Sequence, residues 1–246
     1  YEIADKIKNG LISKKQVLDS LNESGLKGKG GAGFPTGKKW EIVSNYNGKK
    51  YVAVNGDEGE PGTFKDRSYL ESDPHRFLEG ALIASYFINA QKVYIYMRDE
   101  YPTVIKILLD EINKMEDEEI IPKDFFIVRR GAGAYICGEE SAMIESIEGK
   151  RGLPRHRPPY VAEIGLFGCP TLTNNLETLF WVRDIIEKGA KWFAEKGSNG
   201  NKGFHSFSVS GRVKNPGVKV APAGITIQQL IDCLLYTSDA ADDQCC

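Results

Sequence analysis

The sequence lacks the features that mark membrane, secreted and nucleic-acid-binding proteins. Its 246 residues include 32 basic and 34 acidic side chains, a formal net charge of −2. That balance is too near neutral for a protein built around a polyanion. No apolar run reaches the ~18 residues that a membrane-spanning helix needs, and the first residues, YEIADKIKNG, hold no apolar signal-peptide core. Because the chain begins with Tyr1, we expect its native start to be missing.

Histidine and cysteine are also scarce, which weakens several catalytic interpretations. The three histidines are His75, His156 and His205, and none lies near Cys137 in the sequence. A nucleophilic cysteine needs such a base, so a thiol mechanism is disfavoured. No His or Cys lies close to the acidic segment 55–62 either, so we predict no metal site.

Glycine, in contrast, is abundant and clustered. Of 26 glycines, ten fall between Gly25 and Gly62 and seven between Gly131 and Gly168. Flexible linkers are rich in glycine and serine and poor in aromatic residues, but these windows contain Phe34, Trp40 and Tyr135 among other aromatics. We therefore expect structured loops in which the backbone is approached closely by something else.

The segment between the two windows alternates strand and helix signals. Short apolar runs at 51–54, 93–97 and 125–128 read as strands, and helices are expected from Asp73-Pro74 and from Pro102. This order predicts a parallel α/β sheet with right-handed crossovers, whose ligands bind beyond the carboxyl ends of the strands. Both glycine windows reach such ends.

Two flanking regions extend this pattern. Ser13 and Gln16 form a capping box ahead of one helix, and another helix follows Asn174-Asn175. From about Phe204 the alternation of 206–210, a turn at 215–217 and a strand at 218–220 indicate a second, small module.

The first motif with chemical potential is GKGGAGFPTGKKW, residues 28–40. Glycines ahead of a helix can hold phosphate with their N–H groups. A Walker A loop is excluded because no Lys-Ser/Thr pair ends the motif, and the G-x-G-x-x-G spacing here follows no strand. A structural turn stays open, but Phe34 and Lys39 offer an aromatic face and a cation to a ligand.

The second motif, NGDEGEPG at 55–62, gathers an amide and three carboxylates at a strand end. A solvated acidic loop is one interpretation, and a glycosidase-type carboxylate pair is another. Nothing else in the chain indicates carbohydrate chemistry. Acceptors in this place suit a ring edge or ribose hydroxyls better.

Two further segments follow the third expected strand. GAGAYICGEE, residues 131–140, has small residues that admit a flat ligand, and two glutamates at a helix start, where the helix dipole stabilises carboxylates. KRGLPRHRPPY, residues 150–160, holds cations in a proline-stiffened segment. We interpret it as a shaped anion contact, because nucleic acid requires a wider basic face.

Four of these motifs, in order, resemble one family. GLKGKGGAGFPTGKKW, NGDEGEPGTFKDR, GAGAYICGEE and PTLTNNLET are similar to the FMN- and NADH-binding subunit of respiratory complex I. NAD-linked hydrogenases and NAD-dependent formate dehydrogenases contain the same subunit type. The resemblance runs from about Ser13 to Ile231. Within the group, GEESAMIESIEGKRGLPRHRPPY looks most like the diaphorase (β) subunit of formate dehydrogenase.

The resemblance implies a hydride transfer between NAD(H) and FMN, with electrons passed on to iron–sulfur clusters and no catalytic side chain beyond the flavin. The positions that it assigns to FMN are Gly28, Lys29, Gly30, Gly31, Lys39, Asn55, Asp57, Glu58, Tyr135, Gly138, Glu139, Asn174, Asn175 and Thr178. Those that it assigns to NADH are Phe34, Glu60, Glu140, Arg157 and Tyr160, with Glu139 and Glu140 lining the hydride-transfer site. Tyr160 takes the place of a Phe and Arg157 that of a Lys common in complex I members.

The resemblance also implies a domain order. Residues 1–203 would form a Rossmann-like FMN/NADH-binding domain with FMN at the strand ends, and residues 204–232 part of a β-grasp-like (SLBB) domain. The helical domain whose cysteines bind an iron–sulfur cluster is absent, as is its cysteine motif. Residues 233–246, CLLYTSDAADDQCC, read like a translated sequencing adapter, so we expect the genuine sequence to stop near Asp232.

The expected partners are a thioredoxin-like iron–sulfur subunit and a catalytic or electron-carrying subunit, with no nucleic acid and no membrane insertion. Without the tail, Cys137 and Cys169 alone are left, which fits a reducing cytoplasm. In complex I, the protein would lie at the cytoplasmic membrane face. The alternatives are complex I itself and, from another class, a nucleotide-binding module without redox turnover.

Overall fold

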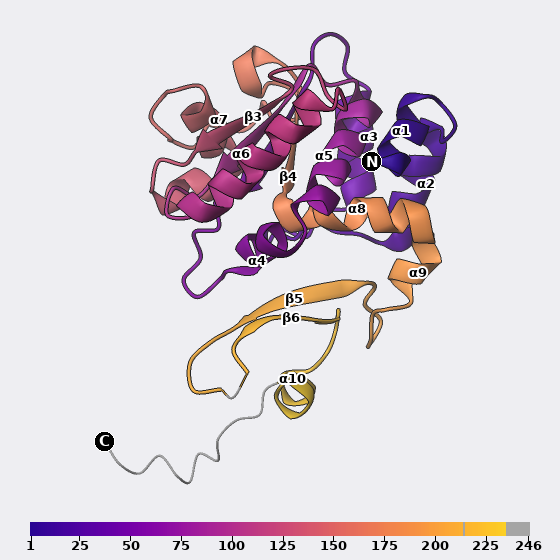
Figure 1. Cartoon of the computed structure of the whole chain (residues 1–246), viewed down its shortest axis with the longest axis vertical. Helices are drawn as coiled ribbons and strands as arrows, with labels where there is room; N and C mark the ends of the chain where they lie inside the picture. Colours follow the sequence, from indigo (N-terminus) through magenta and orange to yellow (C-terminus); the bar gives the residue numbers. More distant parts are fainter. Residues whose placement is uncertain (214, 235–246) are drawn as a thin grey trace.

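A four-stranded parallel sheet forms the centre of the protein (Figure 1). The computed structural model describes residues 1–213 and 215–234. The strand order is β3-β2-β1-β4, and every neighbouring pair is parallel. The strands are β1 Tyr51–Gly56, β2 Lys92–Met97, β3 Phe126–Arg130 and β4 Thr171–Asn175. The expected α/β fold with a parallel sheet is confirmed.

The helices follow the local signals in the sequence. Ser13 and Gln16 form the capping box, and the Asp73 carboxylate accepts the Arg76 N–H ahead of Pro74. The helices are α1 Glu2–Lys8, α2 Lys14–Ser24, α3 Thr36–Ser44, α4 Lys65–Ser72, α5 Pro74–Ile88, α6 Pro102–Asp117, α7 Glu140–Ile147, α8 Leu176–Lys188, α9 Ala190–Ala194 and α10 Ile227–Leu234. Short 3₁₀ turns occupy Tyr135–Gly138 and Leu166–Gly168.

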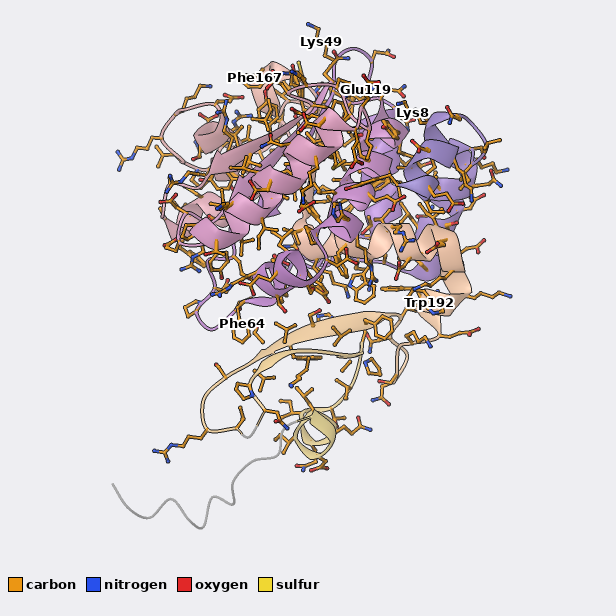
Figure 2. The ribbon with its side chains drawn as sticks, in the orientation of Figure 1. Lys8, Lys49, Phe64, Glu119, Phe167 and Trp192 are labelled. Carbon is orange, nitrogen blue, oxygen red and sulfur yellow. The ribbon has the colours of Figure 1, made fainter. Side chains whose placement is uncertain are left out.

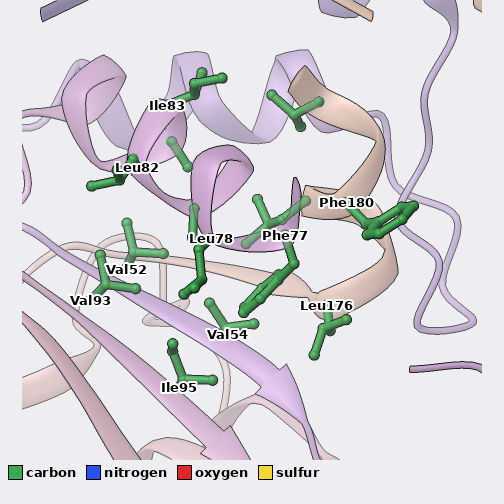
Figure 3. Close-up of a cluster of buried hydrophobic side chains, with 14 of the residues drawn as sticks. Val52, Val54, Phe77, Leu78, Leu82, Ile83, Val93, Ile95, Leu176 and Phe180 are labelled. Atoms are coloured by element: carbon green, nitrogen blue, oxygen red, sulfur yellow. The ribbon is translucent and has the colours of Figure 1, made fainter. Parts of the chain in front are cut away.

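One face of the sheet carries most of the core. Alternate side chains of β1 and β2 point to this face, where Phe77 and Leu78 of α5 pack against Val52 and Val54 (Figure 3). All four of these side chains are fully buried. Burial of one such side chain contributes about 1.5–3 kcal/mol, so this contact is a main source of stability.

The opposite face is covered more thinly. Ala53, Tyr94 and Tyr96 pack there against Met143 and Ile144 of α7. The Tyr96 hydroxyl hydrogen-bonds the Ser146 hydroxyl at 2.8 Å and accepts the Ala132 N–H at 2.9 Å. The tyrosine thus connects the sheet to the loop that follows β3.

Gly80 permits a very close helix contact. A Cβ added at this residue of α5 would overlap the Leu179 carbonyl of α8. The backbones of α5 and α8 are therefore in direct contact at Gly80 and Leu179, and this contact fixes the start of α8 against the sheet.

The strand order places a topological switch point between β1 and β4. The chain leaves β1 towards β2 and β3 on one side, and β4 pairs with β1 on the other. In open α/β sheets, the crevice at such a point binds the ligand. The sequence pattern did not predict β4, because TLTNN has no apolar alternation, yet this strand creates the switch point.

A second, two-stranded sheet lies beside the helices of the first (Figure 1). It consists of β5 Phe204–Val209 and β6 Gly217–Pro222, which are antiparallel, and α10 follows them. The division into domains near residue 203 stays a prediction, as does the non-native tail, whose residues 235–246 lie outside the described residues. Among the described residues, no helix has both the length and the apolar character that crossing a bilayer requires.

Candidate functional site

A cleft of about 590 Å³ opens at the carboxyl ends of β1 and β4. Its size falls in the range of about 300–1,000 Å³ that is usual for small-molecule and cofactor sites. The lining residues come from the glycine loop before α3, the turn after β1, the start of α4, the loop after β3 and the end of β4. They are Lys29, Gly30, Gly31, Asn55, Asp57, Glu58, Gly59, Glu60, Thr63, Lys65, Asp66, Tyr135, Ile136, Gly138, Glu139 and Asn175.

The cleft brings together eleven of the nineteen residues that the family resemblance assigned. Those that line it are Lys29, Gly30, Gly31, Asn55, Asp57, Glu58, Glu60, Tyr135, Gly138, Glu139 and Asn175. Five others, Gly28, Lys39, Glu140, Asn174 and Thr178, do not line the cleft, and their contacts are described below. Phe34, Arg157 and Tyr160 are exposed side chains outside the lining. The roles of individual residues stay predictions.

Asp57 carries a buried carboxylate oxygen with no protein partner. Its Oδ2 finds no hydrogen-bond donor in the described part of the chain. Burial raises the pKa of this carboxyl to about 6, although the Arg98 guanidinium acts in the opposite direction. Asn55 fixes the turn, because its Oδ1 accepts the Asp57 N–H at 3.0 Å and its Nδ2 donates to the Gly138 carbonyl at 2.8 Å. A bound molecule with an N–H or O–H group would satisfy the free oxygen.

Glu58, the next residue, has its side chain committed to α4. Its carboxylate accepts the backbone N–H groups of Asp66 at 3.0 Å and Arg67 at 3.4 Å. It therefore caps the N-terminus of α4, where the helix dipole favours negative charge. Burial and the nearby Asp66 carboxylate raise the pKa of Glu58. The structure thus gives Glu58 the task of placing α4 at the cleft wall.

Lys65 and Asp66 line the cleft and were missed by the sequence reasoning. The Lys65 ammonium donates to Asp66 Oδ1 at 2.7 Å and lies 3.0 Å from Glu177 Oε2 on α8. Burial would lower the pKa of Lys65, but these two carboxylates outweigh it and raise the pKa. Burial raises the pKa of Asp66, the Lys65 charge opposing it. The only signal was the letters KDR after the acidic loop, and no pattern separates them from a solvated helix start.

Asn175 joins β4, α4 and α8. Its Oδ1 accepts the Glu177 N–H at 3.0 Å as the N-cap of α8, and its Nδ2 donates to Asp66 Oδ2 at 2.8 Å. The glycine loop approaches the same residue closely, because a Cβ added at Gly30 would lie 3.3 Å from the Asn175 Cβ. A larger side chain at position 30 would press on this wall of the cleft.

The glycine loop itself is held at both ends. The Gly28 N–H donates to the Phe34 carbonyl at 2.9 Å, and the Lys29 N–H donates to Thr178 Oγ1 at 2.9 Å. Gly31 has φ +108°, a conformation that L side chains rarely adopt. These contacts explain how Gly28 and Thr178 act on the cleft without lining it.

A second charged group lies behind the loop that follows β3. The Lys39 ammonium donates to Glu140 Oε1 at 2.7 Å and to Thr173 Oγ1 at 2.7 Å, and Thr173 Oγ1 also donates to Glu140. Burial would raise the pKa of Glu140, but Lys39 and its other partners outweigh burial and lower the pKa. Beside this group, Trp40 Nε1 donates to Asn174 Oδ1 at 2.9 Å, which leaves Asn174 buried away from the cleft.

The outer rim of the cleft is built from longer, more exposed side chains. Arg157 pairs with Glu139 and lies 3.7 Å from Glu140. The Tyr135 hydroxyl donates to Glu60 Oε1 at 2.5 Å, an interaction that raises the pKa of Tyr135. The Glu139 carboxylate also caps α7 by accepting the Ser141 and Ala142 N–H groups. The rim thus presents carboxylates, a guanidinium and the Tyr135 ring to solvent.

The acidic side chains of the cleft are bound by other groups of the protein. Among the described residues, no group of three or more His, Cys, Asp or Glu side chains is arranged to hold a metal ion. The carboxylates of the cleft are instead satisfied by backbone N–H groups, by Lys65, by Arg157 or by Tyr135, apart from the free oxygen of Asp57.

One family model and several bacterial proteins are similar to this chain in sequence. A sequence model of the Nuo51 FMN-binding domain matches residues 21–184. The F subunit of the NADH-quinone oxidoreductase of Aquifex aeolicus (strain VF5) is 45% identical over 239 residues, covering 94% of this chain and 56% of that protein. The F 2 subunit of the same type of oxidoreductase in Rhizobium meliloti (strain 1021) is 44% identical, covering 91% and 55%.

A solved structure is similar as well. A chain of the NAD+-reducing [NiFe]-hydrogenase, crystallised in the H2-reduced state, superposes with a TM-score of 0.84 at 40% identity. The match covers 89% of this chain and 38% of the hydrogenase chain. The present chain also spans only about half the length of the curated relatives it matches.

Proposed function

The chain belongs to the Nuo51 FMN-binding domain family, and on that premise we propose that its cleft holds FMN and that the protein transfers hydride between NAD(H) and this flavin. When bound, FMN supplies hydride chemistry and the release of single electrons, which no side chain provides. The activity proposed is that of an NADH:acceptor oxidoreductase subunit.

The observation that carries the proposal is the free Asp57 oxygen in a cleft at the switch point. An unpaired buried acceptor costs about 1–3 kcal/mol unless a partner satisfies it, so its presence supports a bound molecule with a donor. Gly131 and Gly138 place no side chain beside this carboxylate. A Cβ added at Gly131 would lie 3.3 Å from Asp57 Oδ1, and one added at Gly138 would lie 4.0 Å from Oδ2. The residues present therefore fit a flat ring edge with N–H groups.

The chain's own residues would act by holding and orienting the two ring systems. Asn55, Asp57 and Gly138 would contact the flavin, and the glycine loop with Lys29 would hold its phosphate chain. Phe34, Glu60, Arg157 and Tyr160 would bind the nicotinamide nucleotide at the rim. Orientation of two stacked rings needs no acid or base, which agrees with the lack of a nucleophile–histidine pair.

The finer assignment within the family concerns the reaction partner. We propose the β subunit of an NAD-dependent formate dehydrogenase, supported by the segment GEESAMIESIEGKRGLPRHRPPY. The NADH-binding subunit of complex I is the second candidate, and the named bacterial relatives favour it. In both cases electrons would pass to iron–sulfur clusters of a thioredoxin-like subunit, in the cytoplasm or at the cytoplasmic face of a membrane.

A titration and a co-purification separate these possibilities. Addition of FMN to the purified full chain should quench flavin fluorescence up to one equivalent, and a chain that binds NADH but never FMN would instead be a non-redox nucleotide-binding module. The affinity-tagged protein, isolated from its source, should then bring down a molybdenum-containing formate dehydrogenase subunit. Recovery of quinone-reducing membrane subunits in its place would favour complex I.

A further inference from the structure

Strand β5 of the second module touches the cleft wall from behind at three points. The side chains of Ser206 and Ser208 lie at alternate positions and so share one face of the strand, and Phe204 adds a contact through its main-chain carbonyl. The Phe204 carbonyl accepts the Lys29 ammonium at 2.5 Å, and Ser208 Oγ accepts the Phe64 N–H at 2.9 Å. Figure 2 shows Phe64 on the flavin-domain side of this strand. Each contact reaches a segment that lines the cleft.

The third contact, made by Ser206, enters a directed chain of hydrogen bonds. Its hydroxyl donates to Glu177 Oε1 at 2.7 Å and lies 2.6 Å from the Tyr69 hydroxyl. A hydroxyl has one hydrogen, and a carboxylate only accepts. Because Ser206 gives its proton to Glu177, Tyr69 must donate to Ser206. Burial and the Glu177 charge raise the pKa of Tyr69, so it keeps that proton.

The chain ends at an ammonium group in the cleft wall. The second Glu177 oxygen, Oε2, lies 3.0 Å from Lys65 Nζ, which also donates to Asp66 at 2.7 Å and lies 3.4 Å from Asn175 Oδ1. An ammonium has three donors, and all three are therefore in use. The side chains of Glu177 and Asp66 are 2% and 3% exposed, so their charges depend on these partners rather than on water.

We propose that Ser206 is a positioning residue for the FMN site: it holds Glu177, and through Glu177 the Lys65 ammonium at the cleft wall. This rests on the proposed function for the identity of the ligand. The second module is then part of the flavin site, although none of the lining residues of the cleft belongs to it.

Loss of the Ser206 hydroxyl has a defined electrostatic consequence. Glu177 Oε1 loses its donor, and the carboxylate must take more of its stabilisation from Lys65. The ammonium is drawn towards α8, and the local potential at the cleft becomes more negative. A ligand that carries a phosphate and gains negative charge on reduction is then bound less tightly and is harder to reduce.

Three variants of the full chain test the proposal. We expect Ser206→Ala to raise the FMN dissociation constant about tenfold and to move the flavin midpoint potential to a more negative value. Ser206→Thr keeps the hydroxyl and should restore both quantities. Ser208→Ala is the matched control, because it deletes a hydroxyl from the same face of β5. That hydroxyl accepts a backbone N–H and contacts no charged group. It should lower the unfolding temperature but leave the flavin potential at the wild-type value.

The FMN affinity and the flavin potential of these variants decide whether Ser206 has a positioning role. Wild-type affinity and potential in Ser206→Ala would overturn the positioning role, as would equal potential shifts in Ser206→Ala and Ser208→Ala. If Ser206→Ala does not fold, Tyr69→Phe carries the test, with a smaller rise of about two- to fivefold expected and an unchanged dissociation constant as the refuting outcome. A wild-type chain that binds no FMN would contradict the proposed function itself, and the positioning role with it.

Discussion

The inner wall and the outer rim of the cleft differ in burial and in how far their side chains are already paired. The inner wall, next to β4, α4 and α8, consists of groups already paired with one another, namely the buried Asp66 and the half-buried Lys65 and Asn175. The outer rim exposes its side chains, with Tyr135 at 65% exposure, and we propose that the exposed rings of Phe34 and Tyr160 extend it. A preorganised wall suits a cofactor that stays bound, because little order must be created on binding. An open rim suits a nucleotide that enters and leaves in each turnover.

The largest effect is expected from breaking the inner wall at Lys65. Lys65→Met leaves Asp66 and Glu177 buried without their cation, and removal of one partner of a buried ion pair typically costs about 3–5 kcal/mol. We expect a loss of that size in the free energy of unfolding, measured by urea denaturation, together with loss of FMN binding. Lys6→Met is the control, because Lys6 pairs with the exposed Glu2 carboxylate on α1 and its loss should change neither quantity. Equal stability of the two variants would contradict the account.

The outer rim should respond in the opposite way. Tyr160→Ala removes an exposed ring, so we expect unchanged stability and unchanged FMN affinity. The dissociation constant for NAD(H) should rise up to about tenfold, because aromatic stacking contributes about 0.5–1.5 kcal/mol. Isothermal titration of the FMN-loaded chain measures it, with Tyr160→Phe as the variant that keeps the ring. A loss of FMN in Tyr160→Ala would mean that the walls are not separate.

The pH dependence of the free energy of unfolding tests the environment of Asp57 in the cleft. The pKa of Asp57 rises from its ordinary 3.8 to about 6 on folding, so the folded chain holds this proton longer than the unfolded chain. Stability is therefore lost as the pH rises from about 4 to 6. In Asp57→Asn, this fall should become shallower, because only Glu58 and Asp66, whose pKa values burial also raises, still contribute to it. A series of denaturation curves across that window would detect the change. A fall of undiminished slope would show that Asp57 does not titrate as described.

Glu140 should change the pH dependence of stability in the opposite direction to Asp57, and by a smaller amount. Its pKa is lowered below the ordinary 4.5, with Lys39 as the main partner, so its contribution to stability is present above pH 4.5 and is lost as the pH falls through the lowered pKa. Glu140→Gln should reduce the acid-induced loss of stability below pH 4.5 and leave the window from about pH 5 to 6 unchanged. The same denaturation series measures it, and a changed slope in that upper window would refute the assignment.

The sequence was sufficient for the parts of the fold that depend on local signals. Asp73-Pro74 marked the start of α5, and the apolar runs marked β1, β2 and β3, because capping and burial leave regular patterns. The strand β4 was not predicted, since Thr173 and Asn174 are buried polar residues whose reason lies in Lys39 and Trp40, far away in the chain. Long-range partners of this kind leave no periodicity.

The same distinction applies to the site. The glycine and acidic motifs located the cleft, because a strand end followed by small or acidic residues is a local feature. Lys65, Glu177 and Ser206 were not found, because the contacts that join the three to one another link segments 29 or more residues apart. The alternation of Ser206 and Ser208 indicated a strand, but nothing in it indicated which surface the strand would face.

One measurement tests the central claim most directly: an anaerobic titration of the FMN-loaded full chain with NADH, followed by the flavin absorbance. We expect one tightly held FMN per chain, whose oxidised absorbance band is lost on addition of about one equivalent of NADH. In Tyr160→Ala, the same band should need more NADH while the FMN stays bound. A chain that takes up no FMN, or whose bound FMN keeps its oxidised spectrum in excess NADH, would contradict the proposed hydride transfer.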